Sequence, residues 1–147
     1  MESTKLLGFI PSVPRGAGQK KDMTHHIPRT FGLPHAKELK VTHRAEVVSQ
    51  AQVGYLPGLL GFREGPLLVS AARKLRARAD VFLVDGHGRA HPRRFGLACQ
   101  VGLALNQPTI GVAKTPFYGR IEKDRIMSPD EELLGKVVTA GNGKATM

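Results

Sequence analysis

One stretch, residues 81–94, constrains the fold of this chain more than any other part of the sequence. Four apolar residues, 81–84, run directly into Asp85, and a glycine-rich loop with histidines and arginines follows. A short apolar run bounded by glycine is typical of a buried strand whose last side chain reaches solvent. Glycines let another molecule approach the backbone, and arginine and histidine bind phosphate. The stretch therefore predicts a phosphate-binding site at a strand end, and the plainer alternative is that Asp85 only starts a turn.

The flanking segments alternate between strand and helix patterns. Strands are predicted over residues 39–48 (an edge strand), 81–84, 108–114 and 132–139, and helices from Gly65 onward and over 95–105. The apolar stripe of the first helix consists of Leu68, Ala71, Ala72 and Leu75. Strands that alternate with helices pair in parallel through right-handed crossovers. Ligands of such sheets bind beyond the carboxyl ends of the strands, so Asp85 and Lys114 are expected at one edge.

Length, charge and cysteine content limit the class of protein. The chain has 147 residues, enough for one domain with one core. A formal net charge of +10 favours a polyanionic partner, above all nucleic acid. The basic residues at 73, 74, 76 and 78 are equally well explained as favourable cations at a helix end. The single cysteine, Cys99, is expected to be a small core residue in a reducing cytoplasm. No apolar run approaches the ~20 residues of a membrane span, so no membrane partner is expected.

The two ends of the chain differ in character from its middle. Residues 1–37 hold four prolines and no sustained hydrophobic period, which predicts an irregular or disordered leader. Residues 38–140 form the predicted core. Residues 141–147 are predicted to be a flexible tail.

Three motifs in order resemble the endonuclease V family, the deoxyinosine 3′-endonucleases. They are Tyr-Leu-Pro-Gly-Leu-Leu-Gly-Phe-Arg-Glu-Gly-Pro at 55–66, Val-Asp-Gly-His-Gly-Arg-Ala-His-Pro-Arg-Arg-Phe-Gly at 84–96, and Pro-Thr-Ile-Gly-Val-Ala-Lys at 108–114. The resemblance covers roughly residues 39–139. It implies a ribonuclease-H-like α/β fold, a mixed sheet with flanking helices. It also implies cleavage of the second phosphodiester bond 3′ to deoxyinosine in DNA repair, with Mg²⁺ as cofactor and Mn²⁺ as substitute. The implied partner is DNA containing deoxyinosine, or RNA containing inosine.

The resemblance also implies roles for particular residues. The implied metal ligands are Asp85 and Glu64, and the implied catalytic residues are these two with Lys114 and His91. The implied wedge is Tyr55, Leu56 and Pro57, with Gly58 as a further substrate-binding residue. The implied base pocket includes Gly86, His87 and Gly88. Plainer alternatives exist. Tyr55 is explained equally as a turn aromatic on the core, Glu64 as a favourable acid near a helix start, and His91 as a hydrogen-bonding loop residue.

The sequence departs from the family at both ends. The family begins with a strand that carries a metal-binding aspartate in a Val-Asp-x-Ser-like setting. Here the only aspartate before Tyr55 is Asp22, in a polar setting. The first strand and a C-terminal segment are therefore expected to be missing from the sheet. Two alternatives to an active nuclease follow: a catalytically incomplete relative that binds nucleic acid, and a truncated gene product.

Overall fold

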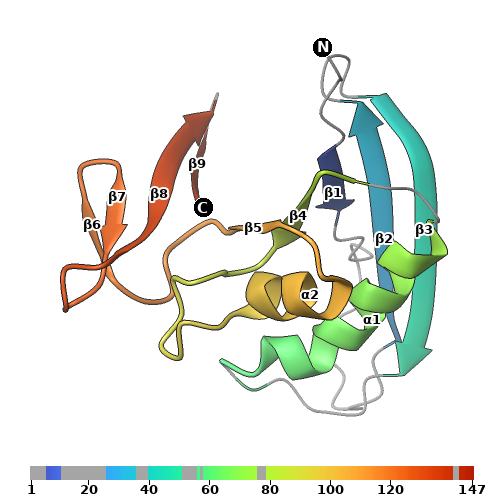
Figure 1. Ribbon diagram of the computed structural model, residues 1–147, viewed down its shortest axis with the longest axis horizontal. Helices are drawn as coiled ribbons and strands as arrows, with labels where there is room; N and C mark the ends of the chain where they lie inside the picture. Colours follow the sequence, from blue (N-terminus) through green and yellow to red (C-terminus); the bar gives the residue numbers. More distant parts are fainter. Residues whose placement is uncertain are drawn as a thin grey trace, which may run out of the picture.

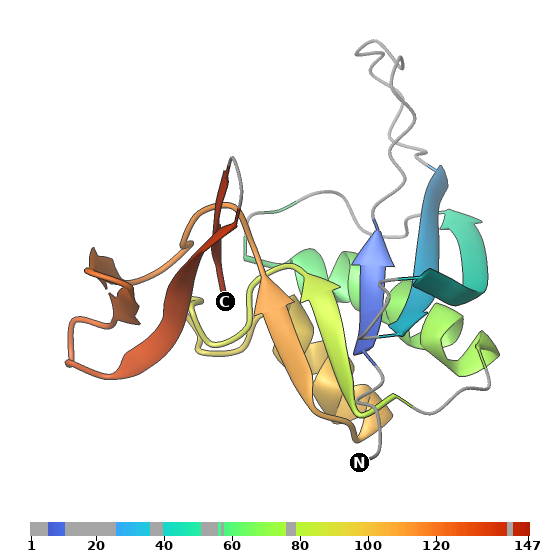
Figure 2. The ribbon, with the colours of Figure 1, turned by 90° about the horizontal axis from the view of Figure 1, so that it is seen from above.

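A computed structural model describes residues 6–10, 26–35, 40–50, 56, 58–75, 79–140 and 143–147. These residues form a five-stranded sheet with two helices on one face and, beside it, a second sheet of four strands (Figures 1 and 2). The mixed α/β architecture confirms the predicted fold class. No described helix is long and apolar enough to cross a membrane.

The five-stranded sheet has the order β3-β2-β1-β4-β5. Its strands are β1 (Leu6–Ile10), β2 (His26–His35), β3 (Lys40–Gln50), β4 (Val81–Asp85) and β5 (Thr109–Val112). β4 runs parallel to both β1 and β5, whereas β2 is antiparallel to β1 and β3. β3 is an edge strand, as predicted. β4 lies between two partners, and Phe82 and Val84 are buried, which explains its uninterrupted apolar run.

The two helices bury the main core against this sheet. α1 (Leu60–Lys74) contacts β2 and β3, and α2 (Leu97–Leu105) contacts β4 and β5. The predicted apolar stripe of α1 is confirmed, because all four of its members are buried. Leu68 is fully buried, and a leucine in such a place contributes about 1.5–3 kcal/mol through apolar burial.

α1 begins earlier than the sequence pattern predicts. It starts at Leu60 rather than at Gly65, and Pro66 lies inside the helix. Proline removes one intrahelical hydrogen bond. Here its ring is on the exposed side, while Gly61, Gly65 and Leu68 form the buried face. Packing of that face therefore carries the helix through the proline, as tertiary contacts often override local propensity.

The segments that the sequence pattern predicts to be irregular contain strands. β1 and β2 fall within residues 1–37, and β1 lies between β2 and β4, where the departure from the family predicts no strand. β9 (Gly143–Thr146), within the predicted tail, pairs with β8 (Leu133–Ala140). Backbone pairing forms these elements without a clear hydrophobic period. In β2, the register shifts between Gly32 and Pro34, as expected of a proline in a strand.

The second sheet has the order β6-β7-β8-β9, with β6 (Arg120–Glu122) and β7 (Arg125–Met127). Its strand β8 confirms the strand predicted over 132–139. A small second core consists of Ile126 and Leu134 of this sheet and Ala90 of the loop after β4. The two sheets meet where Ala113, just after β5, exchanges two backbone hydrogen bonds with Thr146, of 2.9 and 2.7 Å.

Candidate functional site

The carboxyl ends of β4 and β5 carry the first pair of predicted site residues. Asp85 is the last residue of β4, is exposed, and is in register with Val112 of β5. Lys114 follows two residues after Val112 and is also exposed. The structure therefore places both side chains at one edge of the sheet, as the parallel pairing predicts.

The loop after Asp85 folds back onto the first turn of α2. The carbonyl oxygens of His87 and Gly88 accept hydrogen bonds from the N–H groups of Ala98 (3.1 Å) and Gly96 (2.9 Å). A Cβ at Gly96 would stand 2.2 Å from the His87 oxygen, so only glycine fits there. The helix start thus fixes the course of the loop.

His91 is the buried titratable group of this loop, with 6% of its surface exposed. Its Nδ1 accepts a hydrogen bond of 3.1 Å from the Arg93 N–H, and its ring centroid lies 5.4 Å from that of Phe117. Burial lowers the pKa of His91 below its usual value, and a hydrogen bond to the Gly58 backbone opposes this. Burial thus favours the neutral form of this imidazole.

His87 completes a group of three rings. Its Nε2 lies 2.8 Å from the carbonyl oxygen of Thr115, and its ring centroid lies 5.6 Å from that of Phe117. Phe117, which is 44% exposed, contacts both imidazoles. The arrangement offers aromatic faces to a flat ligand.

These three rings line a pocket of about 150 Å³. Its lining consists of Gly58, Leu60, Gly61, His87, His91, Gly96, Leu97, Gln100 and Phe117. Gly58, His87 and His91 are sequence-predicted site residues that the pocket brings together. The sequence analysis misses Leu60, Gln100 and Phe117. For two of these the sequence holds a signal: Gln100 is a polar residue between the apolar positions of α2, and Phe117 is an aromatic residue three positions after Lys114.

The turn before α1 forms the rim of this pocket. The Leu59 N–H donates to the Leu56 carbonyl oxygen over 3.0 Å, and Gly58 has a φ of +80°, which favours glycine. Leu56 is exposed, so its side chain is available to a ligand. Tyr55 and Pro57, the other predicted wedge residues, lie outside the described residues.

The remaining glycines of the predicted base pocket lie elsewhere. Gly86 packs against Leu97: a Cβ at this position would stand 3.0 Å from the leucine side chain. Gly88 lines a larger cavity of about 520 Å³ between α2, β5 and the second sheet. That cavity has an apolar wall that includes Cys99, Ile126 and Leu134, and Asp85 does not line it.

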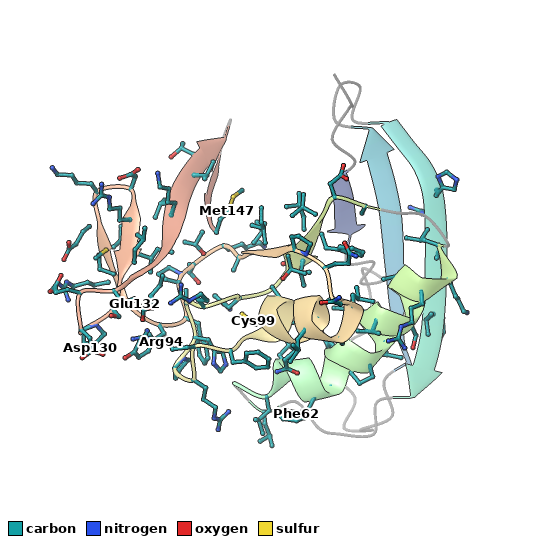
Figure 3. All side chains as sticks on the ribbon, in the orientation of Figure 1. Phe62, Arg94, Cys99, Asp130, Glu132 and Met147 are labelled. Atoms are coloured by element: carbon teal, nitrogen blue, oxygen red, sulfur yellow. The ribbon has the colours of Figure 1, made fainter. Side chains whose placement is uncertain are left out.

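The loop arginines differ in what they contact. Arg94 lies 3.4 Å from Glu132 and 3.7 Å from Asp130, with its guanidinium 4.9 Å from the centre of the Tyr118 ring (Figure 3). Arg94 therefore connects this loop to the turn before β8. Arg93 is exposed and donates to the Gly58 carbonyl oxygen over 3.3 Å, at the rim of the pocket. Of the two, Arg93 is placed to contact a phosphate.

The basic residues at the end of α1 contact carbonyl oxygens of neighbouring elements, and Arg73 contacts one at a helix end. Arg73 donates to the carbonyl oxygen of Ala104, in the last turn of α2, over 3.3 Å, and Lys74 donates to that of Glu46 over 3.4 Å. Cations near helix carbonyls are favourable there. Residues 76–78 lie outside the described part of the chain.

The implied metal ligands do not form a complete metal site. Glu64 is half-buried in α1 and Asp85 is exposed, and the described residues contain no group of three His, Cys, Asp or Glu side chains that could hold an ion. β1 pairs with β4 as Leu6 with Val81 through Gly8 with Leu83, and continuing this register sets Ile10 opposite Asp85. Magnesium prefers several hard oxygen ligands. With no acid in β1, the described donor set does not fit a complete magnesium centre.

Comparisons with known proteins give a consistent result. The sequence profile of the family described as Endonuclease V matches residues 18–142. An endonuclease V of Dehalococcoides mccartyi is 54% identical over 125 residues, covering 80% of this chain and 54% of that protein. The chain spans about half the length of the curated relatives it matches.

Solved structures show the same likeness. An endonuclease V from Streptomyces avermitilis superimposes with a TM-score of 0.80 at 28% identity, covering 98% of this chain and 64% of that one. An endonuclease V of Ciona intestinalis, in complex with DNA containing an inosine followed by a ribo-adenosine, superimposes with a TM-score of 0.78 at 22% identity. This second match covers 99% of the present chain and 70% of the Ciona chain, and it supports the fold.

Proposed function

Because the chain belongs to the endonuclease V family, we propose that it recognises deoxyinosine in DNA as the lesion-binding part of a repair nuclease. The observation that carries the proposal is the pocket of Gly58, His87, His91 and Phe117, in which His87 follows the strand-end carboxylate Asp85 by two residues. A pocket of this kind, formed by rings and glycines, suits one flat base taken out of the stack.

Base extrusion explains why the pocket and the turn at its rim adjoin. An enzyme that acts at one base pays an unstacking cost of a few kcal/mol, which is smallest for a mispaired or damaged base. In the proposal the wedge of residues 55–58 fills the space left by the base. The extruded base lies among the rings, and Arg93 contacts the backbone phosphate. The same contacts extend the proposal to inosine in single-stranded RNA.

The catalytic part of the proposal is cleavage of the second phosphodiester bond 3′ to deoxyinosine, with Mg²⁺ or Mn²⁺. Asp85 and Glu64 are the acids that this chain contributes, and Lys114 supplies a positive charge for the phosphate. His91 is buried against Gly58 and Phe117, so we assign it to the base pocket rather than to the phosphate. Cleavage depends on a further carboxylate that the described residues do not bring to this site. A reducing cytoplasm, indicated by the single cysteine, is the proposed compartment.

A second candidate function, binding without cleavage, is favoured by one observation. β1, the parallel neighbour of β4, contains no acid. A site with one carboxylate at this edge binds a divalent ion weakly, because binding and in-line hydrolysis both need the complete geometry.

Two assays on the same protein separate these functions. A duplex with one deoxyinosine is compared with an undamaged duplex, first for binding without divalent ions and then for nicking with Mg²⁺ or Mn²⁺. The nuclease function predicts preferential binding and a cut one nucleotide beyond the inosine, lost in Asp85→Ala. The binding function predicts the same preference with no cut. Equal binding of both duplexes by folded protein would contradict both functions.

A further inference from the structure

A second hollow, a groove of about 480 Å³ between α1 and α2, adjoins the pocket of the proposed base. The groove and the pocket share two lining residues, Gly61 and Gln100. A nucleic-acid strand that places one base in the pocket therefore has a neighbouring surface on which its next nucleotides can lie.

One stripe of α1 forms a wall of this groove. The stripe consists of Phe62, Pro66, Val69 and Arg73, which follow one another at spacings of three or four residues and so share a face of the helix. Phe62 is 65% exposed and lies at the outer edge of the molecule, at the start of α1 (Figure 3). A large apolar ring gains much from burial, so this ring offers a contact to a ligand in the groove.

The charge of the groove suits a polyanion. Arg73 is exposed and donates one hydrogen bond of 3.3 Å to the carbonyl oxygen of Ala104, which also lines the groove. A guanidinium has five N–H groups and this bond uses one of them, so Arg73 can also donate to a phosphate oxygen. The described residues that line the groove include no aspartate or glutamate. A phosphate therefore meets a cation in the groove and no repulsion from its lining.

An aromatic ring and a cation along one groove form the arrangement by which proteins bind a single nucleic-acid strand. We propose that the groove binds the strand next to the extruded base, with the neighbouring base stacked on Phe62 and a phosphate further along at Arg73. The two residues are about 16 Å apart along the helix axis, so Arg73 meets the phosphate of a nucleotide beyond the stacked one. The assignment rests on the proposed function of the pocket.

Removing bases one at a time tests the stacking on Phe62. Single-stranded oligonucleotides carry one deoxyinosine and an abasic site at one flanking position, on either side, and binding is measured by fluorescence anisotropy with a chelator present. In the wild type, an abasic site at one of these positions should lower the affinity about fivefold or more, as for one lost stacking contact. Phe62→Ala should lower the affinity for the intact strand by a similar factor and show no further loss at that position. Phe62→Trp, which keeps an aromatic face, should behave as the wild type.

Two exposed residues outside the groove provide matched controls. Leu103→Ala removes a side chain of α2 that is 76% exposed, and it should leave the affinity for every strand unchanged. Lys74 follows Arg73 directly but donates to the Glu46 carbonyl oxygen of β3. Arg73→Gln should therefore reduce the slope of log affinity against log salt by about 0.7, the value for one phosphate contact of a single strand, and Lys74→Gln should not.

The outcomes are distinguishable. If Phe62→Ala lowers the affinity by the same factor on every strand, intact or abasic, Phe62 only supports the pocket and the proposal is overturned. An unchanged affinity of Phe62→Ala also overturns it and leaves the groove to a ligand other than nucleic acid. In both cases the proposed function stands if the wild type prefers deoxyinosine to deoxyadenosine on otherwise identical strands, and it falls if that preference is missing. Melting curves show which variants are folded, and Phe62→Leu, which keeps apolar bulk without a flat face, replaces Phe62→Ala if the latter does not fold.

Discussion

At the scale of single residues, His91 links the stability of the chain to pH. Its pKa is lowered from 6.5 by burial, so as the pH falls the unfolded chain takes up this proton before the folded chain does. The stability that comes from neutral His91 is present above pH 6.5 and is lost as the pH falls below that value. We expect the free energy of unfolding to decrease from pH 7.5 to pH 5, and to decrease less in His91→Gln. Urea denaturation at both pH values measures this, and equal decreases in the two proteins would contradict it.

Two glycines of the same loop should respond differently to a methyl group. A Cβ at Gly96 would stand 2.2 Å from the His87 oxygen, whereas at Gly88 the nearest atom, the Gly111 nitrogen, would be 3.9 Å away. Gly96→Ala should therefore lower the free energy of unfolding by about 1–3 kcal/mol, the usual cost of overpacking, and Gly88→Ala should have a much smaller effect. Chemical denaturation of the pair measures the difference. Equal losses would mean that the turn at α2 does not hold the loop.

At the scale of elements, the sequence is a good guide wherever hydrophobic pattern and burial coincide. β4 and α2 are predicted because Val84 and Val101 belong to apolar runs that are buried in the main core. β1, β2 and β9 are not predicted. They are short or contain proline and glycine, so they lack a strand-like hydrophobic pattern, and they form by backbone pairing with neighbouring strands. The site follows the same rule. Residues at a strand end such as Asp85 are predicted, but Gln100 reaches the pocket only through the packing of two helices, which no local pattern records.

The pairing of β1 with β4 leads to a prediction about metal binding at Asp85. Continuing the register of β1 and β4 beyond the pair of Gly8 with Leu83 sets Ile10 opposite Asp85 on a parallel neighbour. Ile10→Asp should therefore create a pair of carboxylates and raise the affinity for Mn²⁺ above that of the wild type, as titration calorimetry would measure. Ile10→Asn, of the same size but uncharged, is the control. The idea fails if Ile10→Asn gains as much affinity, or if Asp85→Asn leaves the gain of Ile10→Asp intact.

At the scale of the whole molecule, some of the positively charged side chains form ion pairs within the protein, and these are less available to a ligand than the others. Of the 22 lysines and arginines, several are engaged within the fold: Arg89 and Arg94 pair with acids of the second sheet, and Arg120 bridges Glu122 and Glu131. These pairs join the loop and strands to the turn before β8, and they reduce the charge available to a ligand there. The count of 22 cations therefore overstates the number that nucleic acid can meet, and position decides which ones take part.

The two neighbouring arginines at 93 and 94 test this distinction. Binding to DNA releases counterions, so the logarithm of affinity falls with the logarithm of salt concentration, with a slope set by the number of phosphate contacts. Arg93 is exposed at the pocket rim, and Arg93→Gln should reduce that slope by about 1. Arg94 is committed to Glu132, Asp130 and the face of Tyr118, so Arg94→Gln should leave the slope unchanged and lower the melting temperature instead. Anisotropy titrations over a series of salt concentrations, with melting curves for each variant, decide between them. If Arg94→Gln changed the slope as much as Arg93→Gln, the ion pairs with the second sheet would have to open when DNA binds.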